Sequence, residues 1–272
     1  MSILLAVQHA SNSTSALCIL GAVLITATII PVSLCLRRDF LAFKALGPGG
    51  TPSTIPGYIR VKLLGLFALR NPYEAAPIPE DLQFKKGYLC SRTLPQRPHP
   101  RPETRGIAPH RQITQRADQD MFIALKGAIE DLGRKGGDHL TIGTSCFEKK
   151  GTGLFSTSPA KRTCRGEICH VHSSDGSLHL TLHPLDARTV LEAGWGERHP
   201  ISRGGVFERF VPKGFLMVYA PQNYNEIAVV LEIVKAAAWY VGGEDCMQAM
   251  RYESSETGMP SRLDLETKPS PS

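Results

Sequence analysis

The stretch EICHVHSSDGSLHLTLHPLDARTVLEAGWGERHP, residues Glu167–Pro200, decides the predicted fold. Apolar and polar residues alternate over 169–172 and again over 178–183, which is the pattern of strands with one buried face. The residues between them, 173–176, are turn formers, so the stretch predicts a β-hairpin. A short helix over 185–193 follows, framed by a proline before it and a glycine after it.

Five of the nine histidines lie in this stretch. His170 and His172 share one face of the first strand, because alternate residues of a strand point to the same side. His179 and His183 share one face of the second strand for the same reason. If the register of the hairpin places these faces side by side, four imidazoles line one side of a two-stranded ribbon.

The bulk composition is that of an ordinary folded protein. Of the 272 residues, 42% are hydrophobic and 21% are charged, which excludes wholesale disorder. The net charge of +6 is local, because residues 84–117 hold eight Lys or Arg and one acid. A single basic loop favours an anionic membrane surface over nucleic acid, so no nucleic-acid partner is expected. Seven cysteines without paired metal spacing favour reduced thiols in a cytosolic domain over a disulfide framework.

The N-terminal segment predicts a membrane anchor. Residues 16–36 carry no charge, and 21 residues suffice to cross the hydrocarbon core as a helix. Arg37 and Arg38 follow at once, whereas no Lys or Arg precedes the run, which argues against a cleaved signal peptide. This charge step predicts a single-pass signal anchor with a lumenal tail over 1–15 and a cytosolic body. The endoplasmic reticulum membrane is the expected location.

The remaining chain divides by composition. Residues 37–110 are predicted to form membrane-proximal helices and a basic, proline-rich connector. Within them, 58–69 is strongly apolar and predicts a helix that lies at the membrane interface or packs under the domain. Residues 94–109 alternate proline with arginine, which predicts an extended loop. Residues 251–272 are rich in Ser, Glu, Thr and Pro and are predicted to be disordered.

Residues 111–245 are predicted to form an α+β domain. Hairpins that are packed with helices, without β–α–β alternation, predict an antiparallel sheet. Periodicity places the other elements: helices over 117–135 and 224–240, and strands over 140–147, 153–155 and 215–219.

Three interpretations of the histidine face follow from its residue types. The imidazoles with Glu167 could hold zinc or iron, but no H-E-x-x-H motif supports a metal, and we do not favour one. Imidazoles in a partly apolar pocket could instead take a proton from an enol or phenol. The third interpretation, surface histidines without a role, is disfavoured by their clustering. No G-x-S-x-G or G-x-G-x-x-G context is present, so neither a serine nucleophile nor a dinucleotide is expected.

The segment Trp195–Pro200 is a second concentration of functional side chains. Arg198 could hold an anionic oxygen, and His199 could act as a further acid or base. In the alternative interpretation the segment is a plain turn, in which Trp195 fills the core and Arg198 pairs with Glu197 or solvent.

These segments resemble a known family. EICHVHSSDGSLHLTL, GWGERHP and FLMVYAPQNYNEIAVVLEIV are similar to the luciferase domain of fungal luciferases, the membrane-anchored enzymes of hispidin-based bioluminescence. The upstream RRDFLAFKALGPGGTPSTIPGYIRVKLLGLF is similar too, and the resemblance runs from about residue 16 to 240. It implies a luciferase-like catalytic domain over 111–245 and a cofactor-independent oxygenase. Such an enzyme deprotonates a 3-hydroxy-2-pyranone such as 3-hydroxyhispidin, lets the enolate react with O2, and breaks down a cyclic peroxide with loss of CO2.

The resemblance implies roles for the candidate residues. The expected catalytic residues are His170 or His172 as the base, His179 and Glu167 to orient it, and Arg198 and His199 to stabilise oxyanion charge. The expected substrate contacts are Trp195, Tyr219, His183 and Asp175. O2 is the expected co-substrate, with no cofactor and no metal, and the expected partners are a small lipophilic substrate and membrane lipids.

Two other functions fit the same sequence. A non-luminous tailoring enzyme of a fungal secondary-metabolite pathway, an oxygenase or cyclase, would use the same histidine-lined pocket. A catalytically idle, membrane-tethered binding protein would need no such chemistry. The catalytic interpretation requires that the hairpin histidines and the Trp195–Pro200 segment face the same cavity.

Overall fold

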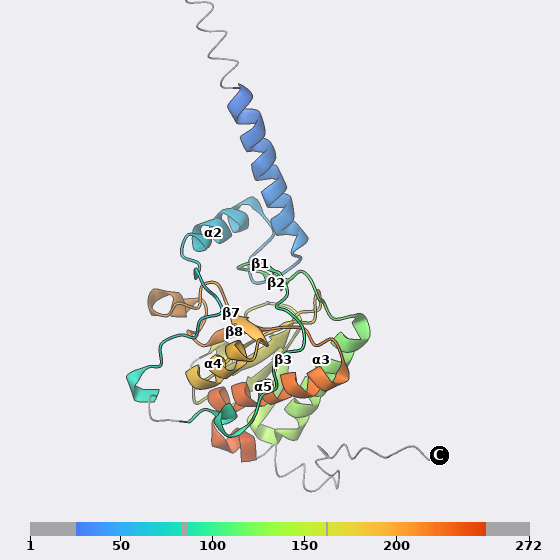
Figure 1. Ribbon diagram of the computed structural model, residues 1–272, viewed down its shortest axis with the longest axis vertical. Coiled ribbons are helices and arrows are strands. Elements are labelled where there is room, and N and C mark those ends of the chain that lie inside the picture. Colours follow the sequence, from blue (N-terminus) through green and yellow to red (C-terminus); the bar gives the residue numbers. More distant parts are fainter. Residues whose placement is uncertain (1–25, 83–85, 162, 249–272) are drawn as a thin grey trace, which may run out of the picture.

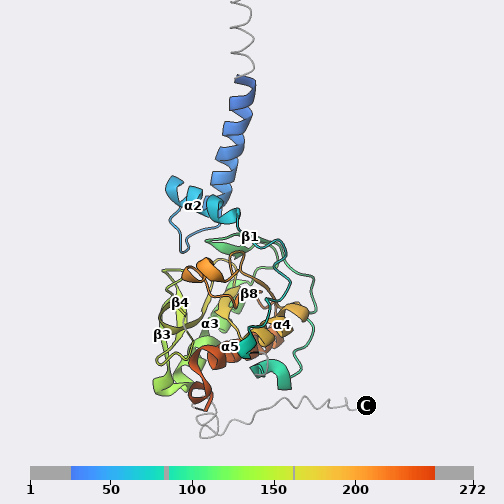
Figure 2. The same ribbon diagram turned by 90° about the vertical axis from the view of Figure 1, so that its left-hand side faces the viewer.

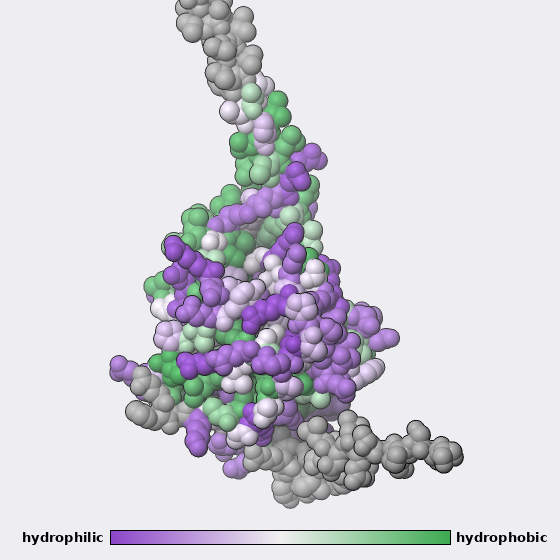
Figure 3. All heavy atoms as spheres, in the orientation of Figure 1, coloured by the Kyte–Doolittle hydropathy of each residue, from purple (hydrophilic) through white to green (hydrophobic). Residues whose placement is uncertain are grey.

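The computed structural model describes residues 26–82, 86–161 and 163–248. A helix over residues 26–45 leads into a body made of one six-stranded sheet, a two-stranded hairpin and several helices. In Figure 1 this helix rises from one end of the body, and α2 (Ile55–Gly65) lies beside its lower end. Figure 2 shows the same arrangement from the side. Hydrophobic side chains gather over both helices (Figure 3).

All neighbouring strands of the main sheet are antiparallel, in the order β3-β4-β5-β6-β8-β7. The strands are β3 (Leu140–Thr144), β4 (Thr152–Ser156), β5 (Glu167–Val171), β6 (Leu178–Thr181), β7 (Gly196–Arg198) and β8 (Phe215–Val218). The predicted α+β class with an antiparallel sheet is confirmed. The predicted central hairpin is β5–β6.

One face of the sheet packs against two long helices. Cys169 of β5 pairs with Leu180 of β6, so both apolar side chains point to the same side and enter the main core. The helices α3 (Gln119–Lys135) and α5 (Tyr224–Gly242) cover this side (Figure 1). Each begins at a side chain that caps its first turn, Asp118 for α3 and Asn223 for α5.

The opposite face of the sheet is also covered. A second, smaller core lies here and joins the first helix, α2 and the sheet. Its buried members are Phe43, Val61, Ile107, Ile201, Val211 and Phe215. The short hairpin of β1 (Thr104–Gly106) and β2 (His110–Gln112) belongs to this side. The polar faces of β5 and β6 are therefore buried between two apolar cores and are not a free surface.

The structure differs from the predicted elements at two places. Residues 196–198 were expected in a turn and form β7, and the extended loop over 94–109 contains β1 and leads into β2. Strands of three residues are too short for an alternation to be recognised. The other helical segments are α4 (Pro184–Glu192), as predicted, and the short turns η1 (Glu80–Leu82), η2 (Tyr88–Ser91), η3 (Gly137–His139), η4 (Cys164–Gly166) and η5 (Gly205–Arg209).

Only part of the predicted membrane anchor falls on described residues. Residues 16–25 lie outside them, as do the predicted tails over 1–15 and 251–272. Among the described residues, none of the helices combines the length and the apolar character that crossing a membrane requires.

Cys146 and Cys164 form a disulfide bond. The prediction of reduced thiols is therefore wrong for this pair. The two residues are 18 positions apart, in a loop after β3 and in η4, so their meeting follows from the fold and not from a spacing motif.

Candidate active site

The register of the sheet sets four side chains in one row across it. His170 of β5 pairs with His179 of β6. His179 pairs with Met217 of β8, which pairs with Glu197 of β7. Cross-strand partners share a face, so two imidazoles and a carboxylate lie on the side opposite the long helices. All four side chains are buried.

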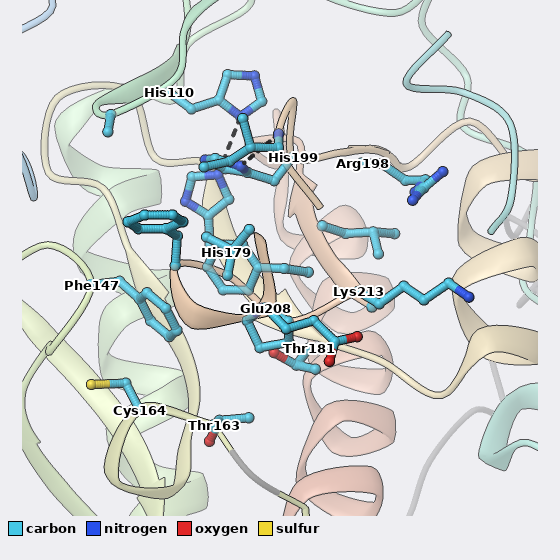
Figure 4. Close-up of a pocket in the computed structure, with 18 of the residues that line it drawn as sticks. His110, Phe147, Thr163, Cys164, His179, Thr181, Arg198, His199, Glu208 and Lys213 are labelled. Carbon is cyan, nitrogen blue, oxygen red and sulfur yellow. Dashed lines mark hydrogen bonds between the residues drawn. The ribbon is translucent and has the colours of Figure 1, made fainter. Parts of the chain in front are cut away.

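Two further histidines join this row from loops and strands outside it. His110 of β2 lies with its ring centroid 5.5 Å from that of His179, and the rings are stacked. His199, directly after β7, lies 5.3 Å from His179 and 5.3 Å from His110 in edge-to-face contacts. Figure 4 shows the three rings together at one end of a pocket. The His199 Nε2 is 2.8 Å from the carbonyl oxygen of Ile107, which accepts its proton.

Three imidazoles form a continuous hydrogen-bonded chain. His172 Nε2 is 3.0 Å from His179 Nδ1, and His179 Nε2 is 3.3 Å from His110 Nδ1. At one end, His110 Nε2 is 3.1 Å from Glu197 Oε1. At the other end, His172 Nδ1 is 2.9 Å from the hydroxyl of Ser177.

That hydroxyl donates in turn to Asp175 Oδ1 at 2.6 Å. We call the sequence Asp175–Ser177–His172–His179–His110–Glu197 the histidine chain.

Burial determines the charge of the imidazoles. It lowers the pKa of His172 to about 4, and hydrogen bonding to Asp175 offsets only part of this effect. Burial, together with repulsion from neighbouring imidazoles, also holds the pKa of His179 and of His199 well below the usual range. These rings are therefore neutral at neutral pH.

The carboxylates at the two ends are ionised. Burial alone would raise the pKa of Glu197, but hydrogen bonds from His110, Thr104 and Tyr219 outweigh it and lower the pKa. The hydroxyls of Thr104 and Tyr219 lie 2.7 and 2.9 Å from its two oxygens. The pKa of Asp175 is lowered in the same way, because bonds from His172 and Ser177 outweigh burial.

The histidine chain is one proton short in this state. It contains five hydrogen bonds, and each needs one proton. When each imidazole is in its uncharged form, Ser177 supplies one proton and the three rings supply one each, which makes four. With both carboxylates ionised, one of the five contacts therefore has a lone pair on each of its two atoms and no proton between them. The chain can therefore accept one proton without losing any hydrogen bond.

His170 forms a separate pair with Glu167. Its Nδ1 is 2.6 Å from Glu167 Oε1. Glu167 also accepts hydrogen bonds from the Ser145 hydroxyl and the Cys146 backbone N–H, both at 2.7 Å. Because the carboxylate accepts the Nδ1 proton, the lone pair of the imidazole is at Nε2. Among the described residues, no hydrogen bond to that Nε2 is found.

The histidines line a pocket of about 840 Å³. His110, His170, His179 and His199 belong to its wall, whereas His172 does not. Two phenyl rings complete this end of the pocket: Phe147 and Phe215 lie 4.7 Å apart, and Phe215 stacks on His179 at 5.0 Å. The volume fits a small molecule, and the flat walls suit an aromatic or conjugated one.

Two trios of ring nitrogens come close enough to hold a metal ion. They are His110, His179 and His199, and His170, His172 and His179, with donor atoms within 4.8 Å of one another. In the structure, the nitrogens of His179 are used instead for hydrogen bonds to His172 and His110. A metal ion at either trio would have to replace one of these bonds.

The structure brings six of the predicted site residues together. They are His170, His172, His179, His199, Glu167 and Asp175. Of the hairpin histidines, His170 and His179 face one cavity together with His199. Asp175 is placed at the end of the histidine chain and not on the pocket wall, so its expected substrate contact is not seen.

The other four predicted residues lie elsewhere. His183 lies after the end of β6 and caps α4, where it accepts the Leu185 N–H. Its ring packs against Trp239 and Tyr240. Trp195 fills the main core and donates to the Pro95 carbonyl at 2.7 Å, so it does not wall the pocket.

Tyr219 also misses the pocket wall and holds Glu197 instead. Arg198 borders the pocket, but its guanidinium donates to the carbonyls of Ser202 and Glu74 and points away from the histidines (Figure 4). Its expected role as an oxyanion contact is not supported by this geometry.

Two residues of the site were not predicted. His110 stands alone between proline-rich and polar segments, and Glu197 was named only in the alternative interpretation, as a partner of Arg198. No periodicity marks either one, because each reaches the site through a three-residue strand. Their residue types were the only available signal: a histidine in one short polar segment and an acid in another could both belong to a site that is rich in histidine.

Comparisons with known proteins show which family the chain belongs to. A family model described as luciferase domain matches residues 165–237. The chain is 33% identical to a luciferase of Neonothopanus nambi over 238 residues, which cover 81% of this chain and 85% of that protein. It is also 33% identical to a luciferase of Armillaria mellea, over 76% of this chain and 81% of that protein. No solved structure matches the chain. The identity over most of both sequences shows that this chain belongs to the fungal luciferase family.

Proposed function

We propose that this protein is a luciferase-like oxygenase that acts without a cofactor on a small lipophilic enol or pyranone of the 3-hydroxyhispidin type. In this proposal the enzyme removes a proton from the substrate, and O2 reacts with the resulting enolate. One observation carries the proposal: the wall of the pocket holds the buried, uncharged rings of His179 and His199, and His179 belongs to a hydrogen-bonded chain of imidazoles that can accept a proton. Such a wall can accept a proton.

His170 is the base in this mechanism. Glu167 fixes its Nδ1 proton, so Nε2 is the atom that takes the hydroxyl proton of the substrate. The carboxylate then stabilises the imidazolium, which is the role of the third residue in triads of this type. His172 makes no contact with the pocket and acts through His179.

The histidine chain provides a second proton acceptor beside the base. The ring centroids of His170 and His179 are 5.4 Å apart. A proton on the chain turns one of its imidazoles into an imidazolium, and at His179 this local positive charge lies beside the pocket, where it stabilises an enolate or peroxide anion. Of the two residues expected to stabilise oxyanions, His199 lies with the chain, but its Nε2 donates to the Ile107 carbonyl and its Nδ1 accepts the Ile201 N–H, so we do not assign it an oxyanion contact.

The reaction with O2 follows from the charge of the enolate. The enolate gives its electron pair to a new carbon–oxygen bond with O2, which forms a peroxide anion. The terminal oxygen attacks the lactone carbonyl, and the cyclic peroxide loses CO2. Buried walls formed by Phe147 and Phe215 exclude water from the anions during these steps.

Membrane anchoring is part of the proposal. Residues 16–36 form the uncharged run, and in its described part Ile29, Ile30, Val32, Leu34 and Leu36 are all about half exposed. A soluble helix rarely exposes such a series of large apolar side chains. We propose a single-pass anchor in the endoplasmic reticulum, with membrane lipids and a small lipophilic substrate as partners and no nucleic acid.

Turnover by the full chain in lipid nanodiscs tests the proposal. Purified protein is mixed with 3-hydroxyhispidin, and oxygen uptake, CO2 release and light are recorded with the metal content of the same sample. We expect one O2 consumed per CO2 released, in protein that holds no stoichiometric metal. His170→Gln should lower kcat by about 100-fold or more, which is the usual contribution of a general base.

His139→Gln is the matched control, because His139 is exposed and lies outside the site. Unchanged turnover in His170→Gln would remove this residue from the mechanism. Absence of oxygen uptake with a folded wild-type protein, or activity that requires a bound metal, would refute the proposed cofactor-independent oxygenation.

A further inference from the structure

The helix α2 exposes an apolar stripe along one side. Ile55, Ile59, Leu63 and Leu66 follow at intervals of four, four and three residues, so they line up on one helix face. Their exposed fractions lie between 51% and 76%. This face is too regular and too exposed to be chance surface hydrophobicity.

The opposite face of α2 is fixed to the body. Gly57 and Val61 are buried, and Val61 packs in the second core with Phe43 and Ile107. Thr54 accepts the N–H of Gly57 and begins the helix. The stripe is therefore held in a defined orientation on the outside of the molecule.

The charge around the stripe is strongly positive. Residues 37–70 hold six Lys or Arg and one acid, Asp39. Arg60 and Lys62 belong to α2 itself. An apolar face flanked by basic side chains is the composition of helices that lie in the surface of an anionic membrane.

The position of α2 along the molecule matches a membrane surface. Tyr58 packs against Phe40 and Phe43 of the first helix, at ring distances of 5.5 and 5.9 Å, and Lys62 pairs with Asp39. These contacts hold α2 just beyond the C-terminal end of the uncharged run over 16–36. Figures 1 and 2 both show α2 beside the lower end of the helix over 26–45.

The pocket with the histidines opens at the same place. Arg60 and Leu64 of α2 belong to its lining, and so do residues of η5. Beside α2, Phe207 of η5 packs against Phe67 at 5.5 Å. Val206 and Phe210 on this segment are exposed apolar residues, and Phe210 belongs to the lining of the pocket.

We propose that α2 is an interfacial helix whose stripe inserts into the membrane surface, so that a lipophilic substrate enters the pocket directly from the bilayer. The proposal rests on the proposed membrane anchoring and names a second, separate contact with lipid. It assigns the stripe Ile55–Leu66 to lipid acyl chains and the basic flank to anionic head groups. The route from the bilayer then runs past Arg60 and Leu64 to His170 and His179.

Quenching of an introduced tryptophan by brominated lipid tests the contact. The full-length Leu63→Trp variant is reconstituted in vesicles of phosphatidylcholine and phosphatidylserine, with and without dibromo acyl chains. We expect strong quenching of the added fluorescence. Ile123→Trp is the matched control, because Ile123 is an equally exposed apolar residue on α3, and its fluorescence should not be quenched.

A charge variant tests the substrate route. In Ile59→Glu combined with Leu63→Glu, we expect a several-fold higher KM for substrate supplied in vesicles and an unchanged kcat. The control Ile123→Glu should keep the wild-type KM. Neither altered residue lines the pocket, so an effect on the chemical step is not expected.

The outcomes separate this inference from the proposed function. Quenching at position 63 does not require catalysis, so a quenched but inactive protein would refute the oxygenation and leave the lipid contact standing. An active protein without quenching would overturn the lipid contact. Fluorescence of the introduced tryptophan that changes with protein concentration and not with brominated lipid would assign the stripe to a contact with a second protein copy. This result would also overturn the inference.

Discussion

Five histidines are buried together in this site, and their burial disfavours the charged form of each imidazole. A charge on any of these rings would lack water around it and would be repelled by a charge on its neighbours. The low pKa values of His172, His179 and His199 follow from this, with burial as the larger cause. At the residue scale, these three imidazoles are therefore uncharged when the site is empty.

The same pKa shifts predict how stability depends on pH. The pKa of His172 is about 4 in the folded protein against 6.5 for the free side chain, so between these values the unfolded chain binds more protons. The stabilisation is present above pH 6.5 and is lost as the pH falls towards 4. For His172 alone it is on the order of 3 kcal/mol.

Urea denaturation at a series of pH values measures this effect. The free energy of unfolding should decrease from pH 6.5 to 5, a range in which exposed carboxylates hardly titrate. His172→Gln should make the decrease shallower, and His139→Gln should leave it unchanged because His139 is exposed. A free energy of unfolding that is flat over this range would show that the buried histidines are not neutral.

At the scale of elements, strand β7 decides whether the histidine chain is complete. It carries Glu197, and it lies against β8 at Gly196, where an added Cβ would overlap the carbonyl oxygen of Met217. The absence of a side chain at Gly196 therefore lets the two strands approach and places Glu197 beside His110.

Gly196→Ala should separate β7 from β8. We expect a loss of stability of about 1–3 kcal/mol from the overlap, and a lower kcat because Glu197 moves away from His110. Gly127→Ala is the matched control, since nothing lies within 4 Å of its added Cβ and it is in the interior of α3. It should gain about 0.5–1 kcal/mol. Thermal unfolding and turnover of both variants check this, and equal behaviour of the two would contradict it.

At the scale of the whole molecule, two features favour opposite sides of the membrane: the charge pattern favours the cytosol, and the disulfide favours an oxidising compartment. The basic residues after position 36 favour a cytosolic body, where thiols are kept reduced. Cys146 and Cys164 nevertheless lie at bonding distance on the lining of the pocket. Their redox state in the cell therefore reports which side the domain occupies.

Maleimide labelling of membranes from intact cells measures this redox state. Free thiols are trapped with the maleimide at lysis, before they can oxidise. Because the structure joins Cys146 and Cys164 in a disulfide, we expect the pair to be labelled only after reduction. Cys146→Ser combined with Cys164→Ser identifies their share of the signal, since Cys35 and Cys90 are also exposed. Labelling of the pair without prior reduction would contradict this expectation and would agree with the predicted cytosolic body.

The local sequence determined much of this molecule by itself. Alternation over 169–172 and 178–183 predicted β5 and β6, and the helical repeats predicted α3 and α5, because period and capping are properties of neighbouring residues. It also placed His170 and His172 on one face of β5, whereas the register of the hairpin decided that His179 lies beside them. The apolar run over 16–36 stays a prediction, since its first ten residues lie outside the described part.

Only the tertiary structure decided which other groups meet those histidines. His110 arrives from a hairpin 60 residues before His170, and Glu197 arrives through the pairing of β7 with β8. The same packing removed Trp195 and His183 from the pocket, because the main core and the start of α4 bind them. Strand register and the burial of two cores determine these contacts, and both depend on residues far apart in the chain.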